Sequence, residues 1–421
     1  MSSPAATEPS RLAYTYTGFR FYWLTTLVTS FAVQIMSVSI AWQIYDITGE
    51  ALLLGLVGLT LFLPALLFIL VTGFVADRFN RRVVMAICFG LELLCALGFL
   101  AVVSTPGHQV WPIFVILAVL GTVRAFAAPS AQSLAPNLVP PEALASAITL
   151  NMSAWQFASI AGPALGGLLY GISPSVPFIT AAALLAVAVT CVILIPRPAR
   201  RESRQATSIE TMLAGFRYIF RNKTVLGAIS LDMFAVLMAG AYALMPIYAK
   251  DILHAGPLEL GFLRASPGVG ALLMAVVLSR FPVRDHAGKI LFLFVGLFGA
   301  FTVVFGFSTT IWLSVPALIL VGASDMVSVT IRETIMQLWT PDDVRGRVNA
   351  VNSVFIGASN ELGEFRAGTV AALLGPVPAC VIGGVGCIAV AVTWSQLFPT
   401  LREQRSLDRA MVPEAAAPEK A

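Results

Sequence analysis

The chain of 421 residues is 58% hydrophobic and only 11% charged, with a mean hydropathy of +0.86 and a formal net charge of +4. Soluble globular domains carry about 25% charged residues, so this composition excludes a soluble protein and indicates a polytopic membrane protein. Because a helix needs about 20 apolar residues to cross a bilayer, the sequence has room for roughly twelve spans. No ten-residue alternating pattern recurs, which disfavours a transmembrane barrel.

Twelve apolar segments follow one another along the chain, and each is expected to form one transmembrane helix. The predicted spans are 20–46, 51–73, 83–104, 110–132, 146–171, 175–196, 223–249, 258–280, 289–307, 311–338, 347–373 and 377–398. The first twenty residues are polar and contain Arg11 and Arg20, so we expect an uncleaved anchor rather than a signal peptide. The fold class predicted is all-α and membrane-embedded.

The positive charges are distributed unevenly among the loops. Of the 26 Lys and Arg residues, four arginines fall inside spans, only Lys250 falls in an outer loop, and the rest lie in the tails and alternate loops. The positive-inside rule therefore predicts that both termini are cytoplasmic. It also explains the net positive charge without a nucleic-acid partner.

The longest polar stretch, residues 197–222, separates two sets of six spans. Its end, around 208–220, is amphipathic and is expected to be either a surface helix or part of a solvated linker. The predicted organisation is a cytoplasmic tail at 1–19, a six-helix bundle at 20–196, a linker at 197–222, a second bundle at 223–398 and a cytoplasmic tail at 399–421.

The two halves repeat each other. The residues FAV at 31–33 and IY at 44–45 recur 203 positions later. From span 4 onward the offset is 201, and it pairs Gly121 with Gly322, Pro140 with Pro341, Asn151 with Asn352, Gly162 with Gly363 and Gly167 with Gly368. Two pseudo-symmetric six-helix bundles in parallel repeat are typical of major facilitator transporters, which rock one half against the other around a site near the midplane.

The stretch GFVADRFNRR lies between spans 2 and 3 and resembles the signature loop of the major facilitator superfamily, G-x-x-x-D-R-x-x-R-R. The matching residues are Gly73, Asp77, Arg78, Arg81 and Arg82. The family usually has Gly where this chain has Asn80, and since Asn also tolerates left-handed backbone, we expect the turn to be kept.

In this superfamily the loop is thought to lock the outward-facing state, with its Asp at the N-terminus of helix 11. The resemblance implies that Asp77 caps helix 11, which we expect to begin near Arg347, beside the acidic pair at 342–343. It also implies that the arginines of the motif meet those acids. Anchoring at the inner membrane face explains Arg81 and Arg82 equally well, so both interpretations stay open.

Most of the chain resembles the bacterial enterobactin-exporter-like branch, which is grouped with drug:proton antiporters. LAGFRYIF before span 7, ELGFLRASPGVGALL in span 8 and TPDDVRGRVNAVN into span 11 carry this resemblance. AGPALGG in span 5 matches the antiporter motif incompletely, because the upstream glycine positions hold Ala158 and Thr149. The resemblance implies a bacterial inner membrane.

Ten charged residues fall inside predicted spans, where each costs at least about 2.5–3.5 kcal/mol unless it meets a cavity or a partner. They are Glu92, Arg124, Asp232, Arg264, Asp325, Arg332, Glu333, Glu361, Glu364 and Arg366. Arg124 and Asp325 are repeat-equivalent, on helices 4 and 10, which line the central cavity in this superfamily. They are candidates for a contact that forms and breaks during proton coupling, or for a static ion pair.

Further candidates for proton coupling flank this pair. Arg332 shares a helical face with Asp325, and Asp232 lies on span 7, another cavity helix. Glu361 and Glu364 share a face of span 11, and two close carboxylates should not both ionise in a low dielectric. One of them is thus a natural proton carrier, with structural pairing as the alternative.

Span 1 carries a polar stripe at helical spacing, and a stripe facing a wet cavity would contact substrate. Its candidate cavity residues are Ser30, Gln34 and Ser37. Buried hydrogen bonding between helices is the rival interpretation.

The sequence favours a transporter over an enzyme. It has no Walker loop, no nucleophile–base constellation and no His–Cys cluster, and its five cysteines lie in spans without metal-site spacing. We expect no cofactor, no metal and no nucleic acid, and a monomer whose partners are a small-molecule substrate, protons and the lipid bilayer.

The function predicted is proton-coupled export of a siderophore or drug-like compound by alternating access. Uptake or facilitated diffusion of a metabolite remains an alternative, because the fold does not fix direction. A non-transporting membrane scaffold or lipid-handling protein is the second alternative.

Overall fold

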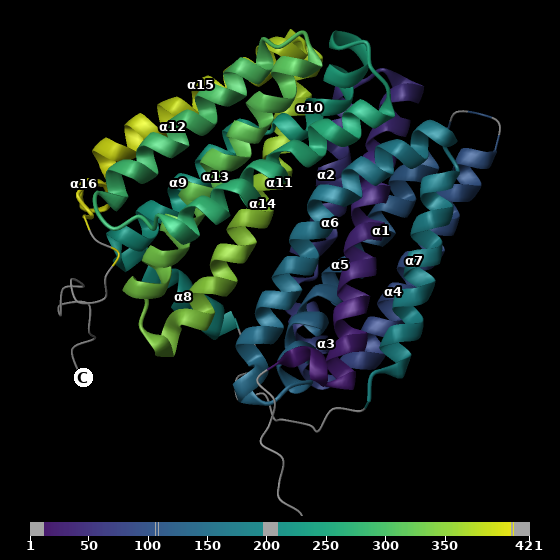
Figure 1. The fold of residues 1–421 in the computed structure, drawn as a ribbon, viewed down its shortest axis with the longest axis horizontal. Helices are drawn as coiled ribbons and strands as arrows, with labels where there is room; N and C mark the ends of the chain where they lie inside the picture. Colours follow the sequence, from purple (N-terminus) through teal and green to yellow (C-terminus); the bar gives the residue numbers. More distant parts are fainter. Residues whose placement is uncertain (1–11, 106, 108, 197–208, 406, 408–421) are drawn as a thin grey trace, which may run out of the picture. The chain divides into compact units, whose positions relative to one another are not determined.

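The computed structural model describes residues 12–105, 107, 109–196, 209–405 and 407. The chain divides into two compact units (Figure 1). Unit 1 comprises residues 1–39 and 63–207, and unit 2 comprises 40–62 and 208–421. The first two helices contribute to both units, because the division falls within each of them. The bounds predicted for the two bundles stay a prediction.

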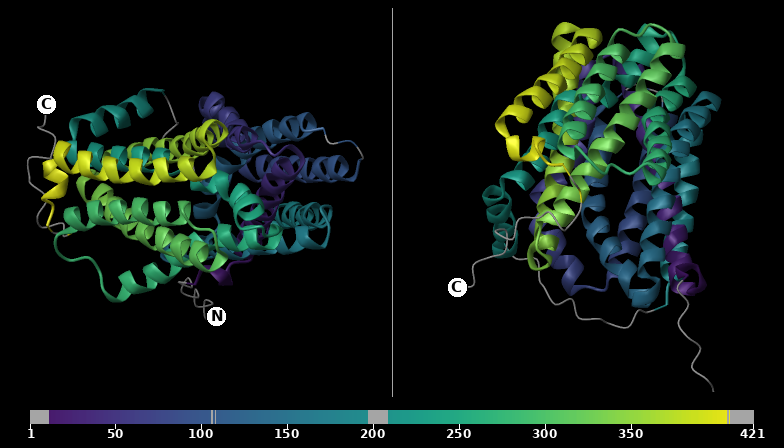
Figure 2. Two further views of the ribbon diagram at one scale, coloured as in Figure 1. Left: turned by 90° about the horizontal axis from the view of Figure 1, so that it is seen from above. Right: turned by 60° about the vertical axis from the view of Figure 1, so that its left-hand side comes forward.

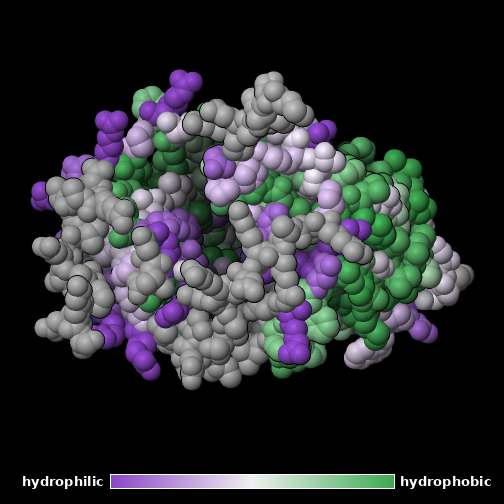
Figure 3. Space-filling view, turned by 90° about the horizontal axis from the view of Figure 1, so that it is seen from below, coloured by the Kyte–Doolittle hydropathy of each residue, from purple (hydrophilic) through white to green (hydrophobic). Residues whose placement is uncertain are grey.

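Unit 1 is built from long helices joined by short turns. Its helices are η1 (Ala13–Thr15), α1 (Thr17–Thr48) up to Ser39, the end of α2 (Ala51–Leu67), α3 (Ile69–Arg78), α4 (Arg81–Ser104), α5 (Trp111–Leu134), η2 (Ala135–Asn137), η3 (Pro141–Ala143), α6 (Leu144–Ile172) and α7 (Val176–Leu194). Helix α4 packs between α5 and α7. Figure 3 shows that hydrophobic side chains, in green, gather on the flank of this unit, as expected for a surface that faces lipid.

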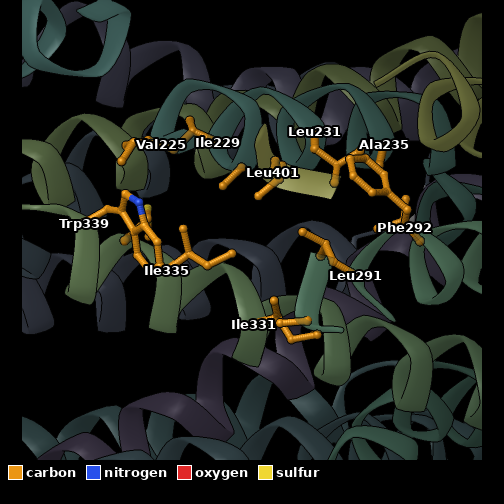
Figure 4. Packing of buried hydrophobic residues seen from close by; sticks show 14 of the residues in the cluster. Val225, Ile229, Leu231, Ala235, Leu291, Phe292, Ile331, Ile335, Trp339 and Leu401 are labelled. Carbon is orange, nitrogen blue, oxygen red and sulfur yellow. The ribbon is translucent and has the colours of Figure 1, made fainter. Parts of the chain in front are cut away.

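Unit 2 contains the ends of α1 and α2 together with the remaining helices. These are α8 (Ile209–Arg221), α9 (Lys223–Ala239), α10 (Ala241–Ile247), η4 (Tyr248–Ile252), α11 (Pro257–Arg280), α12 (Ala287–Gly306), α13 (Ile311–Trp339), α14 (Asp342–Leu374), α15 (Pro376–Leu397) and α16 (Pro399–Arg402). Helix α12 lies beside α13 and α15 (Figure 2). A core of aliphatic and aromatic side chains from α9, α12, α13 and α16 fills the space between them (Figure 4).

Nine helices of the described residues are long and apolar enough to cross a membrane. Three further spans are formed by α2 with α3, by α6 and by α14, so the predicted all-α fold with twelve transmembrane helices is confirmed. A helix does form in the amphipathic part of the linker, since α8 covers Ile209–Arg221, and its place at the membrane surface stays a prediction.

Two predicted helix boundaries are wrong, and a third span contains a break that the sequence did not predict. Span 2 does not end near residue 73 but kinks at Phe68, after Pro64, and continues as α3 to Arg78. Span 7 is interrupted at Gly240, whose φ of +51° ends α9. Helix 11 begins at Asp342, because Pro341 is held in an extended conformation and the acidic pair itself starts the helix. Hydropathy could not detect the end of span 2 or the start of span 11, since polar residues continue these two helices beyond their apolar segments.

The repeat in the sequence corresponds to a repeated helix contact. In unit 1, a Cβ on Gly162 of α6 would lie 2.6 Å from the Cβ of Gln34 on α1. In unit 2, a Cβ on Gly363 of α14 would lie 3.3 Å from the Cα of Leu237 on α9. Both pairs follow the offsets found in the sequence. Small residues let helices approach closely in a lipid environment, so these glycines specify packing.

A second repeated feature is a pair of tryptophans at helix starts. Trp111 begins α5 and Trp312 lies at the start of α13, at the same 201-residue offset. Their exposed fractions are 82% and 87%. Exposed tryptophans at the ends of transmembrane helices are typical of the membrane–water interface, so we interpret both as interfacial anchors.

Candidate functional site

A buried ion pair joins α9 to α13 in unit 2. The guanidinium of Arg332 lies 2.6 Å from the carboxylate of Asp232, and both side chains are only 9% exposed. Arg332 also donates through Nε to the hydroxyl of Ser328, at 3.1 Å. A buried charge is tolerated only when it is paired and hydrogen-bonded, and this arrangement satisfies both requirements.

Asp325 lies beside this pair. Its carboxylate interacts electrostatically with Arg332 and with Asp232, and Glu333 interacts with the same two residues, so one arginine is shared among three acids. Tyr242 of α10 interacts electrostatically with Asp325, with Arg264 and with Glu364. The structure thus brings Asp232, Arg332 and Asp325 together and connects them through Tyr242 to a second group of charges.

The second group consists of Arg264 on α11 with the two acids of α14. Arg264 interacts electrostatically with Glu364. A Cβ on Gly58 of α2 would lie 3.5 Å from Glu364 Oε2, and closer still to Glu361 Oε2. The Oε2 atoms of Glu361 and Glu364 are therefore separated by at most twice 3.5 Å. The carboxylates share one side of α14, facing a glycine that leaves them room.

Arg366 of α14 binds the end of α9, where span 7 is interrupted, and not a charge of these two groups. Its Nε and a terminal nitrogen donate to the carbonyls of Leu237 and Met238, at 3.0 and 2.5 Å. These carbonyls belong to the last turn of α9, which Gly240 terminates and which therefore lacks helical partners. A cation there also complements the negative end of the helix dipole, so Arg366 stabilises the interruption of span 7.

In unit 1 the candidate residues are more dispersed. Arg124 of α5 interacts electrostatically with the buried Glu92 of α4. Arg124 and Asp325 belong to different units, so their pairing stays a prediction. The polar stripe of α1 is half-buried at each candidate position: Ser30, Gln34 and Ser37.

The signature stretch forms two helix ends rather than a loop. Gly73 to Arg78 continue α3, two residues make the turn, and Arg81 begins α4. The turn expected at Asn80 is present, but its backbone is not left-handed: φ is −67°, and the side chain caps α4 by accepting from the backbone of Arg82. An extended N-cap is a position that Asn favours for its side-chain acceptor, which explains why Gly is not needed.

The last two arginines of the motif hold helix ends within unit 1. Arg81 donates to the carbonyl of Ser133 at 3.0 Å, in the last turn of α5. Arg82 donates to the carbonyl of Ile193, in the last turn of α7. Both contacts satisfy carbonyls that a helix end leaves free. Arg78 is exposed and lies 5.6 Å from the centre of the Phe74 ring.

The latch implied for Asp77 stays a prediction. Asp77 lies in the last turn of α3, but its side chain and those at 342–343 lie outside the described part of the structure.

A polar cluster that the sequence did not single out joins α1 to η4. Lys250 Nζ lies 2.6 Å from Asp46 Oδ1, and the Tyr45 hydroxyl donates to the Asp251 carboxylate. The π-helical turn of η4 directs two consecutive side chains toward α1, a geometry that often marks functional sites. We call these four residues, all in unit 2, the clasp, and the loop charges predict the outer side for it. Two weak signals in the sequence pointed to this cluster. They are the dipeptide IY, which recurs in the repeat, and Lys250, the only cation in the loops that are predicted to be outside.

Among the residues that the structure describes, no group of three His, Cys, Asp or Glu side chains could hold a metal ion. The chemistry that these sites offer is ion pairing, hydrogen bonding and proton exchange at carboxylates.

Twelve membrane helices with buried charges define a multi-pass membrane transporter of the major facilitator type, not an enzyme. The chain belongs to the transmembrane secretion effector family, whose model matches residues 11–420.

Similar proteins agree with this assignment. The chain is 26% identical over 415 residues to the enterobactin exporter EntS of Shigella boydii serotype 4, covering 94% of this chain and 95% of the relative. It is also 26% identical to the enterobactin exporter EntS of Escherichia coli O1:K1, over 409 residues, with 94% and 95% coverage.

Solved transporter structures share the fold. The nucleoside transporter NupG superimposes with a TM-score of 0.69 at 14% identity, covering 90% of this chain and 99% of that one. A bacterial homologue of the human lysosomal transporter Spinster, inward-facing and unoccupied, gives a TM-score of 0.67 at 14% identity, with 91% and 96% coverage. These likenesses establish the fold and carry no information about the substrate.

Proposed function

We propose that this transporter exports a siderophore or drug-like small molecule across a bacterial inner membrane, driven by the proton gradient, with both termini in the cytoplasm. The similarity to enterobactin exporters supports export and a substrate of that class. The distribution of Lys and Arg supports the orientation.

The observation that carries proton coupling is the buried charge network of unit 2. The acids of this network outnumber the arginines that they contact: Arg332 interacts with Asp232, Asp325 and Glu333, and Arg264 interacts with Glu364. One carboxylate can therefore take up a proton while both arginines keep an acidic partner. Asp325, which shares its cation with Asp232, is the proposed proton carrier, with Glu361 and Glu364 as contributors.

The clasp and the packing of Gly58 support alternating access. The ends of α1 and α2, residues 40–62, belong to the same compact unit as η4 and α14. The remaining parts of α1 and α2 belong to unit 1. Motion of the units as so divided bends α1 and α2 and keeps the clasp, whereas unbent helices would carry residues 40–62 along with unit 1 and open the clasp. We propose that clasp formation and release accompany the exchange between the two access states.

Transport into inside-out membrane vesicles tests the proposed function. With the vesicle interior acidified, we expect iron-free enterobactin, or ethidium as a drug-like probe, to accumulate inside, and a protonophore to abolish the accumulation. Vesicles that lack the protein provide the control. Accumulation of both probes that is independent of the pH gradient, or that needs an alkaline interior, would contradict proton-coupled export.

Reversing one charge of the clasp should change the transport rate about two- to fivefold, because exposed ion pairs contribute up to about 1 kcal/mol. We expect this for Asp46→Lys and for Lys250→Asp alone, and recovery to within about twofold in the double variant. Asp285→Lys, an exposed acid on unit 2 outside the clasp, is the matched control and should leave the rate unchanged. If both single variants transport at the same rate as the natural chain, a role for the clasp is excluded.

A further inference from the structure

A polar cavity lies where α12 begins, beside the segment that follows α15. Its volume is about 300 Å³. The side chains that line it are His286, Lys289, Arg402, Glu403, Gln404 and Arg405. Three of these six residues are permanent cations, one is an acid, and none takes part in the charge network described above.

The backbone around this cavity is fixed by hydrogen bonds. The amides of Ala287 and Gly288, the first two residues of α12, donate to the carbonyls of Arg405 and Gln404, at 3.3 and 2.9 Å. A Cβ on Gly288 would overlap the carbonyl oxygen of Leu401. The segment 401–405 therefore crosses the start of α12 in close contact, and it presents its cationic side chains from a defined backbone.

The charges of the cavity are not neutralised by its own acid. Arg402 lies 3.3 Å from Glu403, which leaves Lys289 and Arg405 as cations in excess of the single carboxylate. The neighbouring Asp285 is engaged with His286, at 3.1 Å. An anion would therefore gain charge-assisted hydrogen bonds from several directions.

The surface next to the cavity is apolar. Leu293 lies one turn beyond Lys289 on α12, and its side chain is 58% exposed. Leu397, at the end of α15, is 63% exposed, and α12 packs against α15. A cationic pocket continuous with an exposed hydrophobic helix surface matches a molecule with an anionic head and an apolar chain.

We propose that this cavity binds the phosphate group of an anionic phospholipid of the bilayer, with an acyl chain along Leu293 and Leu397. Basic pockets at the inner ends of transmembrane helices recognise such headgroups, and the loop charges predict the inner side for this end of α12. The free phosphate ion shares the headgroup's charge but gains nothing from the adjoining apolar surface. The proposal is independent of the transported substrate.

Native mass spectrometry of the full chain, purified and incubated with phosphatidylglycerol or phosphatidylcholine, tests the site. We expect retained phosphatidylglycerol, and at least about fivefold less of it in the variant Lys289→Gln/Arg402→Gln/Arg405→Gln. The variant Arg217→Gln/Arg280→Gln/Arg284→Gln removes the same charge outside the cavity and should retain the lipid. If the cavity variant does not fold, the single change Lys289→Glu, at an exposed side chain, gives the same comparison.

Thermal unfolding provides the second readout. Phosphatidylglycerol should raise the unfolding temperature of the natural chain and of the control variant, but not of the cavity variant. Equal lipid retention by cavity and control variants would overturn the proposal. Stabilisation by inorganic phosphate or glycerol 3-phosphate equal to that by phosphatidylglycerol would also overturn it, since the site would then recognise the phosphate without the acyl chain.

Discussion

Arg332→Met is expected to destabilise the protein by about 3–5 kcal/mol and to abolish transport, because it leaves Asp232 as an unpaired buried charge. The pair it breaks has a separation of 2.6 Å and is 9% exposed on both sides, so solvent cannot replace the lost partner. The measurement is unfolding of the purified protein in detergent, followed by tryptophan fluorescence.

A second variant separates stability from function. The double change Asp232→Leu/Arg332→Met removes both charges and should recover part of the lost stability, because an apolar pair of similar volume can replace a buried ion pair, while Asp325 still lacks its cation. Transport should not recover, since the proposed network has lost its shared cation. As a control, Arg402→Gln breaks the exposed contact with Glu403 and should change stability by less than about 1 kcal/mol. An unaltered unfolding temperature in Arg332→Met would contradict the buried pair.

The twelve spans were predictable because the bilayer allows few solutions. Backbone groups in lipid must be satisfied within the segment, so every long apolar segment becomes a helix. Helix ends depend instead on local polar chemistry. The residues up to Arg78 and the acidic pair at 342–343 extend their helices beyond the apolar segments. A hydropathy profile does not detect these helix ends, because the residues there are polar.

The interruption at Gly240 shows a second limit of the sequence. Glycine occurs in nearly every span, and nothing adjacent marks this one as the position with a positive φ. Its partner Arg366 binds backbone carbonyls of another helix, which carry no signature in the sequence. The same holds for Arg81 and Arg82, whose acceptors are the ends of α5 and α7.

Part of the charge network could be found from spacing alone. Helical periodicity places Asp325 and Arg332 on one face of a single helix. Their relation to Asp232 connects α9 and α13, and no periodicity within one helix reveals it. Tyr242 was not singled out because it is uncharged, although it interacts with both groups of charges. If the network couples transport to protons, one of its carboxylates must exchange the proton, and a single substitution tests this.

Asp325→Asn should lower proton-driven transport at least about tenfold while leaving the fold intact. The change keeps the size of the side chain and removes its charge, and Arg332 retains its 2.6 Å contact with Asp232. Stability should therefore change little. A tenfold loss corresponds to about 1.4 kcal/mol in the transport barrier, which is modest for a group that exchanges the coupled proton.

The decisive measurement is the dependence of this variant on the gradient. In inside-out vesicles, accumulation of the probe by Asp325→Asn should no longer increase when the interior is acidified. The groups that face Asp325 are Arg332 from its own helix, Asp232 from α9 and Tyr242 from α10, so the loss can be attributed to this network. Asp285→Asn, an exposed acid of the same unit outside both groups of charges, is the control and should keep the dependence.

Glu364→Gln distinguishes the two groups of charges. If this variant loses the gradient dependence while Asp325→Asn keeps both rate and dependence, the proton is carried on α14 and the assignment to Asp325 fails. If both variants lose it, Tyr242 becomes the residue of interest, because it interacts with Asp325 and Glu364 alike. Tyr242→Phe then removes only the hydroxyl, and slowed coupling with normal substrate binding would indicate that protons pass between the two groups through it.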